Sequence, residues 1–132
     1  VRSLAFLGLG LVVLVLYVLF YQLTTSYDIH AEIEQNNVAV GVALAGNMIA
    51  IGLVTFKAVF GEFINWETGL AGFITFAVAG FVLLFLVRVI VDKIILPGTQ
   101  VADELAKDRN IGAAFIQSGV VISVALILNF AI

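Results

Sequence analysis

Carboxamides are the side chains best placed to do chemistry inside the apolar runs of this chain. The stretch NNVAVGVALAGN, residues 36–47, begins with two Asn residues and places a third, Asn47, deep inside the run. Gln117 lies inside a later apolar run. A carboxamide both donates and accepts hydrogen bonds without carrying charge. Asn47 and Gln117 are therefore candidate intramembrane polar contacts, which either join helices or contact a polar ligand or permeating solute.

Residue types that support nucleophilic, redox or metal chemistry are missing from these runs. The chain has no Cys, and its single His, His30, lies between two runs, so no axial ligand for a haem or metal is expected in the membrane. No Asp or Glu lies inside any run, although proton relays and ion-coupled carriers use such carboxylates. Neither a Ser/His/Asp set nor a Gly-rich phosphate loop can be assembled. We expect no enzyme, no catalytic residue, no cofactor and no metal site.

The composition predicts a membrane protein. Of the 132 residues, 63% are apolar, against about 45–50% in soluble domains. Four windows carry no charge, residues 3–27, 37–56, 68–87 and 110–132, and each is close to the roughly 20 residues that cross the bilayer. We predict an all-α, polytopic protein with four transmembrane helices, at about residues 4–22, 37–58, 68–91 and 110–131.

The first run is interpreted as a membrane helix, because its apolar stretch, residues 4–21, is longer than the 7–15 residues or so of a secretory signal. The formal net charge of −3 provides no basic surface for nucleic acid, so the bilayer is the expected partner.

The second half of the sequence repeats the first. IHAEI, residues 29–33, corresponds to VADEL, residues 101–105, at an offset of 72, and NVAVGVALAG, residues 37–46, corresponds to NIGAAFIQSG, residues 110–119, at an offset of 73. The chain is thus predicted to form two helical hairpin repeats, residues 1–60 and 61–132, in one membrane domain. Each repeat crosses the membrane twice, so the repeats are parallel and their acidic connections emerge on the same side.

Basic residues predict the orientation. The side of the two connections carries Arg88, Lys93, Lys107 and Arg109, whereas the opposite side carries Arg2 and Lys57. By the positive-inside rule the connections are expected in the cytoplasm and both termini outside. Lys57 and Arg88 lie near span ends and are expected to extend their charged groups to the membrane surface.

Small residues form two faces on the second and fourth predicted spans. On the second span, one face is Ala39, Ala43, Gly46 and Ala50, and the other is Gly41, Ala45 and Gly52. On the fourth, the repeat gives one face with Gly112, Gly119 and Ser123, and another with Ala114, Ser118 and Ala125. In lipid, helices associate where small residues let backbones approach. We expect these two spans at the centre, the bulkier first and third at the flanks, and either a compact four-helix core or a homo-oligomer.

Asn37 and Asn110 stand at the first residue of these two spans, where an Asn side chain accepts from unpaired backbone N–H groups. Both are predicted to be helix caps.

Two segments carry a resemblance to a known family. YDIHAEIEQNNVAVGVALAGNMIAIGL, residues 27–53, and DELAKDRNIGAAFIQSG, residues 103–119, resemble the DUF350 family of bacterial inner-membrane proteins, which contain two copies of a span pair with an Asn-x-Ala-x-Ala-like opening and a later Gly. Ile111 and Gly112 alter that opening in the second copy. The resemblance implies the fold, a location in the bacterial inner (cytoplasmic) membrane and an envelope or stress association, and it implies no catalytic residue.

These patterns predict a structural or assembly component of a membrane complex, whose partners are other membrane subunits or further copies of the chain. The alternative is a small oligomeric channel or transporter for a neutral or weakly charged solute, with Asn47, Gln117 and Ser123 facing inward.

Overall fold

The computed structural model describes the backbone of residues 2–59, 65–95 and 101–131. Its four long helices are apolar enough to cross a membrane, and they are α1 (Arg2–Leu23), α3 (Val38–Val59), α4 (Trp66–Ile90) and α6 (Ile111–Ala131). Two short helices, α2 (Ile29–Glu34) and α5 (Val101–Ala106), precede α3 and α6, and a π-helical turn, η1 (Val91–Ile95), continues α4. The predicted all-α fold with four spans is confirmed.

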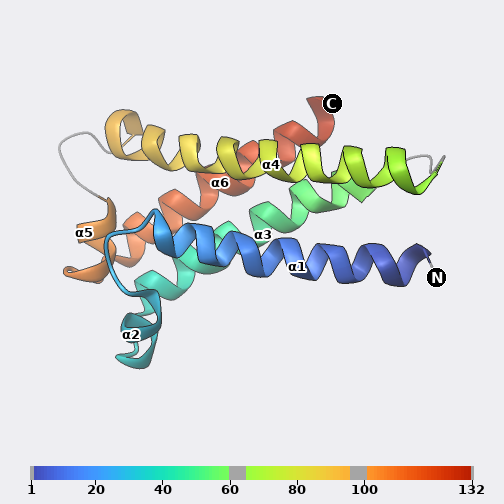
Figure 1. Cartoon of the computed structure of the whole chain (residues 1–132). Helices are drawn as coiled ribbons and strands as arrows, with labels where there is room; N and C mark the ends of the chain where they lie inside the picture. Colours follow the sequence, from blue (N-terminus) through green and yellow to red (C-terminus); the bar gives the residue numbers. More distant parts are fainter. Residues whose placement is uncertain (1, 60–64, 96–100, 132) are drawn as a thin grey trace.

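The long helices form two layers (Figure 1). α1 and α4 run side by side in one direction, and they lie across α3 and α6, which run side by side in the opposite direction. α2 and α5 lie together at one end of the bundle. Both hairpins, α1 to α3 and α4 to α6, therefore enter from the same end, as parallel repeats would.

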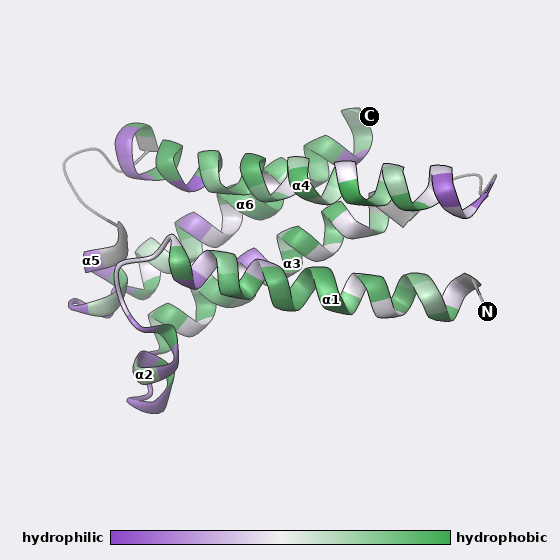
Figure 2. Ribbon diagram, in the orientation of Figure 1, coloured by the Kyte–Doolittle hydropathy of each residue, from purple (hydrophilic) through white to green (hydrophobic). Residues whose placement is uncertain are grey.

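The distribution of hydropathy matches a membrane crossing. Figure 2 shows apolar colour along the middle of the long helices, with polar colour gathered at α2, α5 and the two ends of α4. α3 is the most buried of the four spans, and α1 is the least buried. α6 is no more buried than α4, so of the two helices expected at the centre only α3 holds that place.

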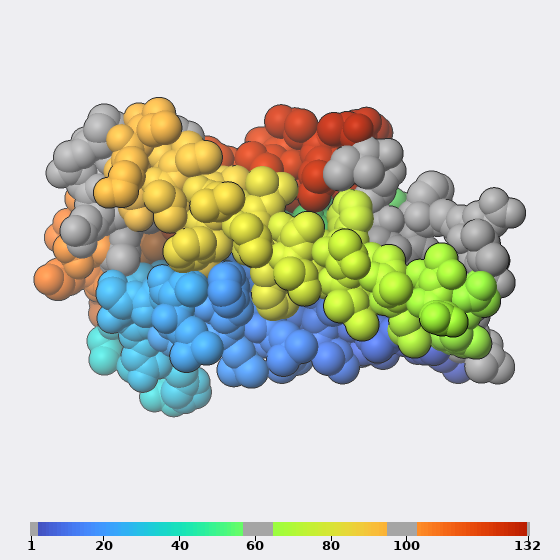
Figure 3. All heavy atoms as spheres, turned by 45° about the horizontal axis from the view of Figure 1, so that its top comes forward, coloured from blue at the N-terminus to red at the C-terminus, as the bar shows by residue number. Residues whose placement is uncertain are grey.

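Aromatic side chains join α1 to α4. The ring of Phe81 lies 5.1 Å from Tyr17, edge to face, and 5.5 Å from Phe20, between ring centroids. Figure 3 shows the two helices forming one continuous surface. The outward sides of both helices expose large apolar residues, including Leu4, Leu11, Leu16, Val78 and Val82. Such a surface suits contact with lipid.

The closest helix contact is between α3 and α6. A Cβ atom at Gly46 would lie 2.7 Å from the Cα atom of Ser118, a separation that real Cβ atoms essentially never show. Ala39, Ala43 and Ala50 on the same face of α3 are fully buried. Gly80 of α4 allows a similar approach, because its Cβ would lie 2.6 Å from Cγ1 of Val54.

The face of α6 that meets α3 is formed by Ala114, Ser118 and Ala125. Gly112, Gly119 and Ser123, which we expected to pack, are instead exposed on the opposite side of the helix. Two polar side chains explain why α6 is turned this way. Ser118 donates to the carbonyl of Val42 (2.8 Å), and Gln117 is buried within the bundle. If α6 were turned to bury its glycines, these two groups would face lipid without partners.

Candidate functional site

Two turns of the same geometry begin α3 and α6. Asn37 accepts from the backbone N–H of Val40 (3.4 Å), and Asn110 accepts from that of Ala113 (3.1 Å). The residue before each has a positive φ angle, 61° at Asn36 and 50° at Arg109. The structure therefore places both asparagines at the helix caps.

The same asparagines bind the acidic residues of the short helices. Nδ2 of Asn37 donates to Oε1 of Glu32 (2.7 Å), and Nδ2 of Asn110 donates to Oε2 of Glu104 (3.0 Å). The sequence had indicated only that these acidic connections emerge on one side of the membrane. The feature of the sequence that could have indicated this contact is the equivalent position of Glu32 and Glu104 in the two repeats.

Asn37 also connects the two halves of the chain. Its Nδ2 donates to the carbonyl of Leu105 in α5 (2.9 Å), and both residues are about 1% exposed. Asn110 is exposed, as is Ile33, the residue of α2 that corresponds to Leu105. Asn37 and Asn110 are therefore equivalent in the repeat but differ in burial, and the same holds for Leu105 and Ile33.

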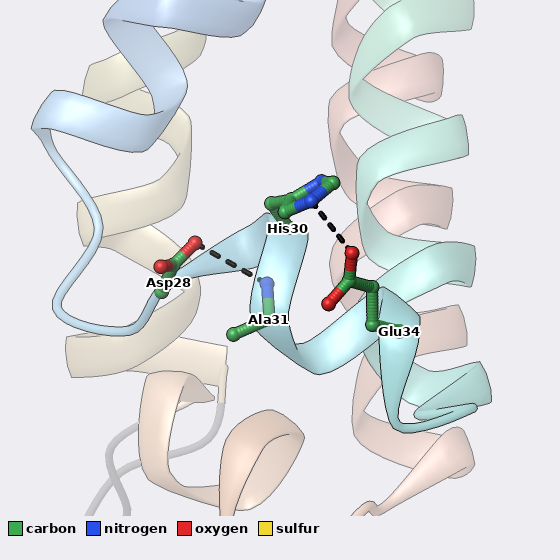
Figure 4. A network of polar contacts seen from close by, with 4 residues as sticks. All are labelled: Asp28, His30, Ala31 and Glu34. Atoms are coloured by element: carbon green, nitrogen blue, oxygen red, sulfur yellow. Dashed lines mark hydrogen bonds and ion pairs between the residues drawn. The ribbon is translucent and has the colours of Figure 1, made fainter.

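Two further polar contacts of α2 lie at its surface. Figure 4 shows Asp28, which accepts from the N–H of Ala31 at 3.3 Å, and His30, which meets Glu34 at 2.9 Å. His30 and Glu34 are largely exposed, and such pairs contribute about 0–1 kcal/mol. We assign them no function beyond the local helix.

A buried hydrogen-bond network joins α1, α3 and α6. Tyr17 donates to Oδ1 of Asn47 (2.9 Å), and Tyr21 donates to Oε1 of Gln117 (3.2 Å). Asn47 donates to the carbonyl of Ala43 (2.9 Å) and to Gln117 (3.4 Å). Both carboxamides expected in the membrane are therefore engaged by protein. The two tyrosines were missed, although their i, i+4 spacing places them on one face of α1.

Arg88 lies beside this network and is 8% exposed. Its Nη2 donates to Thr24 (2.8 Å) and its Nη1 to Thr25 (3.4 Å), and its Cζ lies 4.4 Å from the ring centroid of Tyr21. We expected Arg88 to extend its charged group to the membrane surface, and this expectation is wrong. The guanidinium is instead buried, because Thr24 and Thr25 at the end of α1 accept its hydrogen bonds. The side chain of Lys57 lies outside the described part of the chain.

The guanidinium keeps one unused donor. Nε of Arg88 is buried without a hydrogen-bond partner, and no carboxylate in the part of the chain described here lies within 4.0 Å of the guanidinium. The cation–π contact with Tyr21 is worth up to about 2 kcal/mol when desolvated. An unsatisfied buried donor costs about 1–3 kcal/mol, and more when charged. The buried Nε therefore costs stability, which the threonine hydrogen bonds and the cation–π contact offset.

A hollow of about 220 Å³ adjoins Arg88 at the α2 and α5 end of the bundle. Its lining includes the polar residues Tyr21, Thr24, Thr25, Ser26, Tyr27, Asp92 and Gln117. Burial raises the pKa of the Tyr27 phenol, so Tyr27 remains a neutral hydrogen-bonding group. The π-helical turn η1 begins three residues after Arg88 and carries Asp92, and such turns are frequent at functional sites.

Four apolar helices and a buried polar network define the chain as an all-α, multi-pass membrane protein. It belongs to the DUF350 family, because the family model described as Domain of Unknown Function (DUF350) matches residues 1–132, the whole chain. No curated protein and no solved structure matches it. The resemblance found in the sequence is confirmed.

Proposed function

We propose that this protein is a non-enzymatic structural component of the bacterial inner membrane, which assembles with further copies of itself through the free faces of α3 and α6. The free face of α3 carries the exposed Ala45 and Gly52 and the half-buried Gly41, which lies beside Ile33. The free face of α6 carries Gly112, Gly119 and Ser123. The observation that carries the proposal is that these two faces correspond, through the sequence repeat, to the two faces that already pack together within the chain.

The correspondence can be followed at the closest contact. Within the chain, Gly46 of α3 meets Ser118 of α6. At the offset of 73 residues, Gly46 corresponds to Gly119, and Ser118 corresponds to Ala45. Nothing lies within 4 Å of a Cβ built at Gly119, and Ala45 is exposed. A second copy that places its Ala45 against Gly119 would repeat the internal contact with still smaller side chains.

The helix caps support the same arrangement. The internal contact of Asn37 with the carbonyl of Leu105 has its counterpart in Asn110 and Ile33. Ile33 is 43% exposed although Leu105 is buried, and Asn110 is exposed although Asn37 is buried. Stacking copies would cover both residues. The hydrogen bond from Ser118 to Val42 would not be repeated, because Ala45 has no hydroxyl.

Such an interface is head to tail, since the free face of α6 in one copy meets the free face of α3 in the next. Repeated, it closes into a ring or extends as a filament, depending on the rotation between copies. Because α3 and α6 run in the same direction, every copy keeps the same orientation in the membrane. Small residues permit the close backbone contact that drives helix association in lipid.

The alternative, a channel for a neutral or weakly charged solute, has less support. Asn47 and Gln117 are buried and bound to tyrosines, and Ser123 faces the opposite side of α6. A liposome flux assay tests it, and solute flux that is abolished by Asn47→Leu would favour the channel over the structural role.

Disulfide cross-linking tests the assembly directly, because the chain contains no Cys that would give a background. Ala45→Cys and Gly119→Cys are made in two differently tagged copies and mixed in one membrane. We expect an oxidised dimer when both variants are present, and much less when either is alone, since the interface pairs unlike residues. Val78→Cys on the exposed side of α4 is the control partner. No product for the 45/119 pair, or an equal product with the control, would refute this interface.

A further inference from the structure

A groove of about 710 Å³ lies between α1 and α3, and its lining is mostly apolar. Gly10 and Leu14 of α1 and Gly52 of α3 belong to that lining. We propose that the groove receives α6 of a neighbouring copy, whose Ile127 packs against Gly10. The inference rests on the proposed assembly and adds to it a second helix, α1, as part of the interface.

The sequence repeat extends to α1 and α4. GLVVLVL, residues 10–16, corresponds to GFVLLFL, residues 80–86, at an offset of 70. The offset rises to 72 at the short helices, because the connection that follows α4 is longer than the one that follows α1. Gly10 is therefore equivalent to Gly80, and Leu14 is equivalent to Leu84.

Within the chain, the corresponding groove of the second hairpin holds α3. This helix packs against both α4 and α6 (Figure 1). A Cβ atom at Gly80 would lie 2.6 Å from Cγ1 of Val54 and 3.6 Å from Cδ1 of Ile51. Val54, Ile51 and Leu84 are fully buried. The glycine of α4 thus lets side chains of α3 enter the groove.

The equivalent positions of the first hairpin are open. Gly10 and Leu14 are half-buried, and α1 is the least buried of the four spans. The atom nearest to a Cβ built at Gly10 is the methyl carbon of Thr55 in the same hairpin, at 3.5 Å. Nothing lies within 4 Å of a Cβ built at Gly52, although its counterpart Ala125 is fully buried. The first hairpin therefore lacks the helix that covers the second.

The repeat identifies α6 of another copy as that helix. At the offset of 73 residues, Val54 corresponds to Ile127, which is 64% exposed, and Ile51 corresponds to the half-buried Val124. In the proposed assembly, α6 of one copy already lies along α3 of the next, so the repeat places its Ile127 at Gly10 of that next copy. Apolar side chains gain nothing by leaving lipid, and the close approach at a glycine is what favours a helix over an acyl chain here.

Cross-linking of Gly10→Cys with Ile127→Cys tests the contact. The two variants of the full chain carry different tags and are oxidised in one membrane. The internal pair predicts the geometry, because a Cβ at Gly80 would lie 3.5 Å from Cβ of Val54, and a disulfide needs about 3.5–4.5 Å. We expect a mixed dimer, and much less of it when Gly8→Cys replaces the Gly10 variant. Gly8 is exposed on α1 and lies outside the groove.

A bulky side chain in the groove gives a second test. Gly10→Leu should not lower the thermal midpoint of unfolding in a detergent that separates the copies, because a Cβ at this position makes only ordinary contact. In the membrane it should reduce the cross-linked product of the 45/119 pair by about fivefold or more, since overpacking disfavours a close interface by at least that factor. Gly8→Leu is the matched control and should leave the product unchanged.

The outcomes separate this contact from the assembly itself. A 45/119 product without a 10/127 product would mean that the neighbouring α6 meets α3 alone and that lipid fills the groove, which overturns the inference and leaves the assembly standing. Equal products from Gly10→Leu and Gly8→Leu would overturn it as well. Absence of both cross-linked products would refute the assembly, and this contact with it.

Discussion

Gly46 and Gly119 are equivalent in the sequence repeat and differ in their surroundings. Gly46 contacts the backbone of α6, whereas nothing lies within 4 Å of the Cβ position of Gly119. At the scale of single residues the small side chains therefore have two separate tasks. Gly46 permits close packing of α3 and α6 within one chain, whereas Gly119 leaves a surface on which a second chain can pack.

Substitution by leucine separates these tasks. Gly46→Leu should destabilise the chain by about 1–3 kcal/mol or more, because the added side chain collides with Ser118. Gly119→Leu should leave the thermal stability of the single chain within about 0.5 kcal/mol, the range of substitutions away from packed features, and shift detergent gel filtration toward smaller species. Leu14→Ala on α1 is the control. Equal loss of stability in both glycine variants would show that the two positions are not distinct.

The tyrosine and carboxamide network gives a second residue-scale prediction. Tyr17→Phe keeps the ring and removes the donor to Asn47, so it should destabilise the chain by about 0.6 kcal/mol and at most about 1.7 kcal/mol. A double-mutant cycle with Asn47→Leu, measured by thermal or denaturant unfolding, isolates the pairwise energy. A coupling energy of zero would mean that the hydrogen bond does not contribute to folding.

At the scale of elements, α3 and α6 are each joined to the preceding short helix by one asparagine. The side chain of Asn37 binds its own α3, Glu32 of α2 and the carbonyl of Leu105 in α5. Asn110 binds α6 and Glu104 of α5. The first cap therefore connects three elements and the second connects two, so their contributions to the stability of the chain should differ.

Alanine substitution of the caps tests this difference. Asn110→Ala should cost about 1 kcal/mol, the usual effect of losing a helix cap. Asn37→Ala should cost about 1–3 kcal/mol more, because the buried carbonyl of Leu105 loses its donor. Thermal unfolding in detergent gives the ranking. A greater loss for Asn110→Ala would contradict the structural difference.

At the scale of the whole molecule, α2 and α5 lie at one end of the bundle, and the end of α3 and the start of α4 lie at the other. The excess of Lys and Arg at the connection end predicts that this end is cytoplasmic. Orientation matters for the proposed assembly, because it decides on which side of the membrane the short helices of all copies lie.

Thiol labelling tests the orientation. Glu34→Cys and Glu67→Cys place single thiols at exposed positions on opposite ends of the bundle. A membrane-impermeant reagent added to intact spheroplasts should label the Glu67 variant, and the Glu34 variant should react only after permeabilisation. The reverse pattern would place the connections outside.

Local features of the sequence were enough for the all-α class, the four long helices and the two caps. Apolar runs near 20 residues long predict spans wherever they occur, because the bilayer sets the length. An asparagine that opens such a run caps it through bonds to backbone only three residues away. These features depend on neighbours along the chain, so they are visible in one sequence.

The rotation of α6 about its axis and the burial of Arg88 were decided only by the tertiary structure. Both faces of α6 consist of small residues, and the choice between them depends on Gln117 and Ser118 finding partners on α1 and α3. Arg88 stays inside because Thr24 and Tyr21, more than sixty residues earlier, lie beside it. A periodic pattern identifies the faces of a helix, but which face meets which partner depends on the free energy of contacts between distant segments.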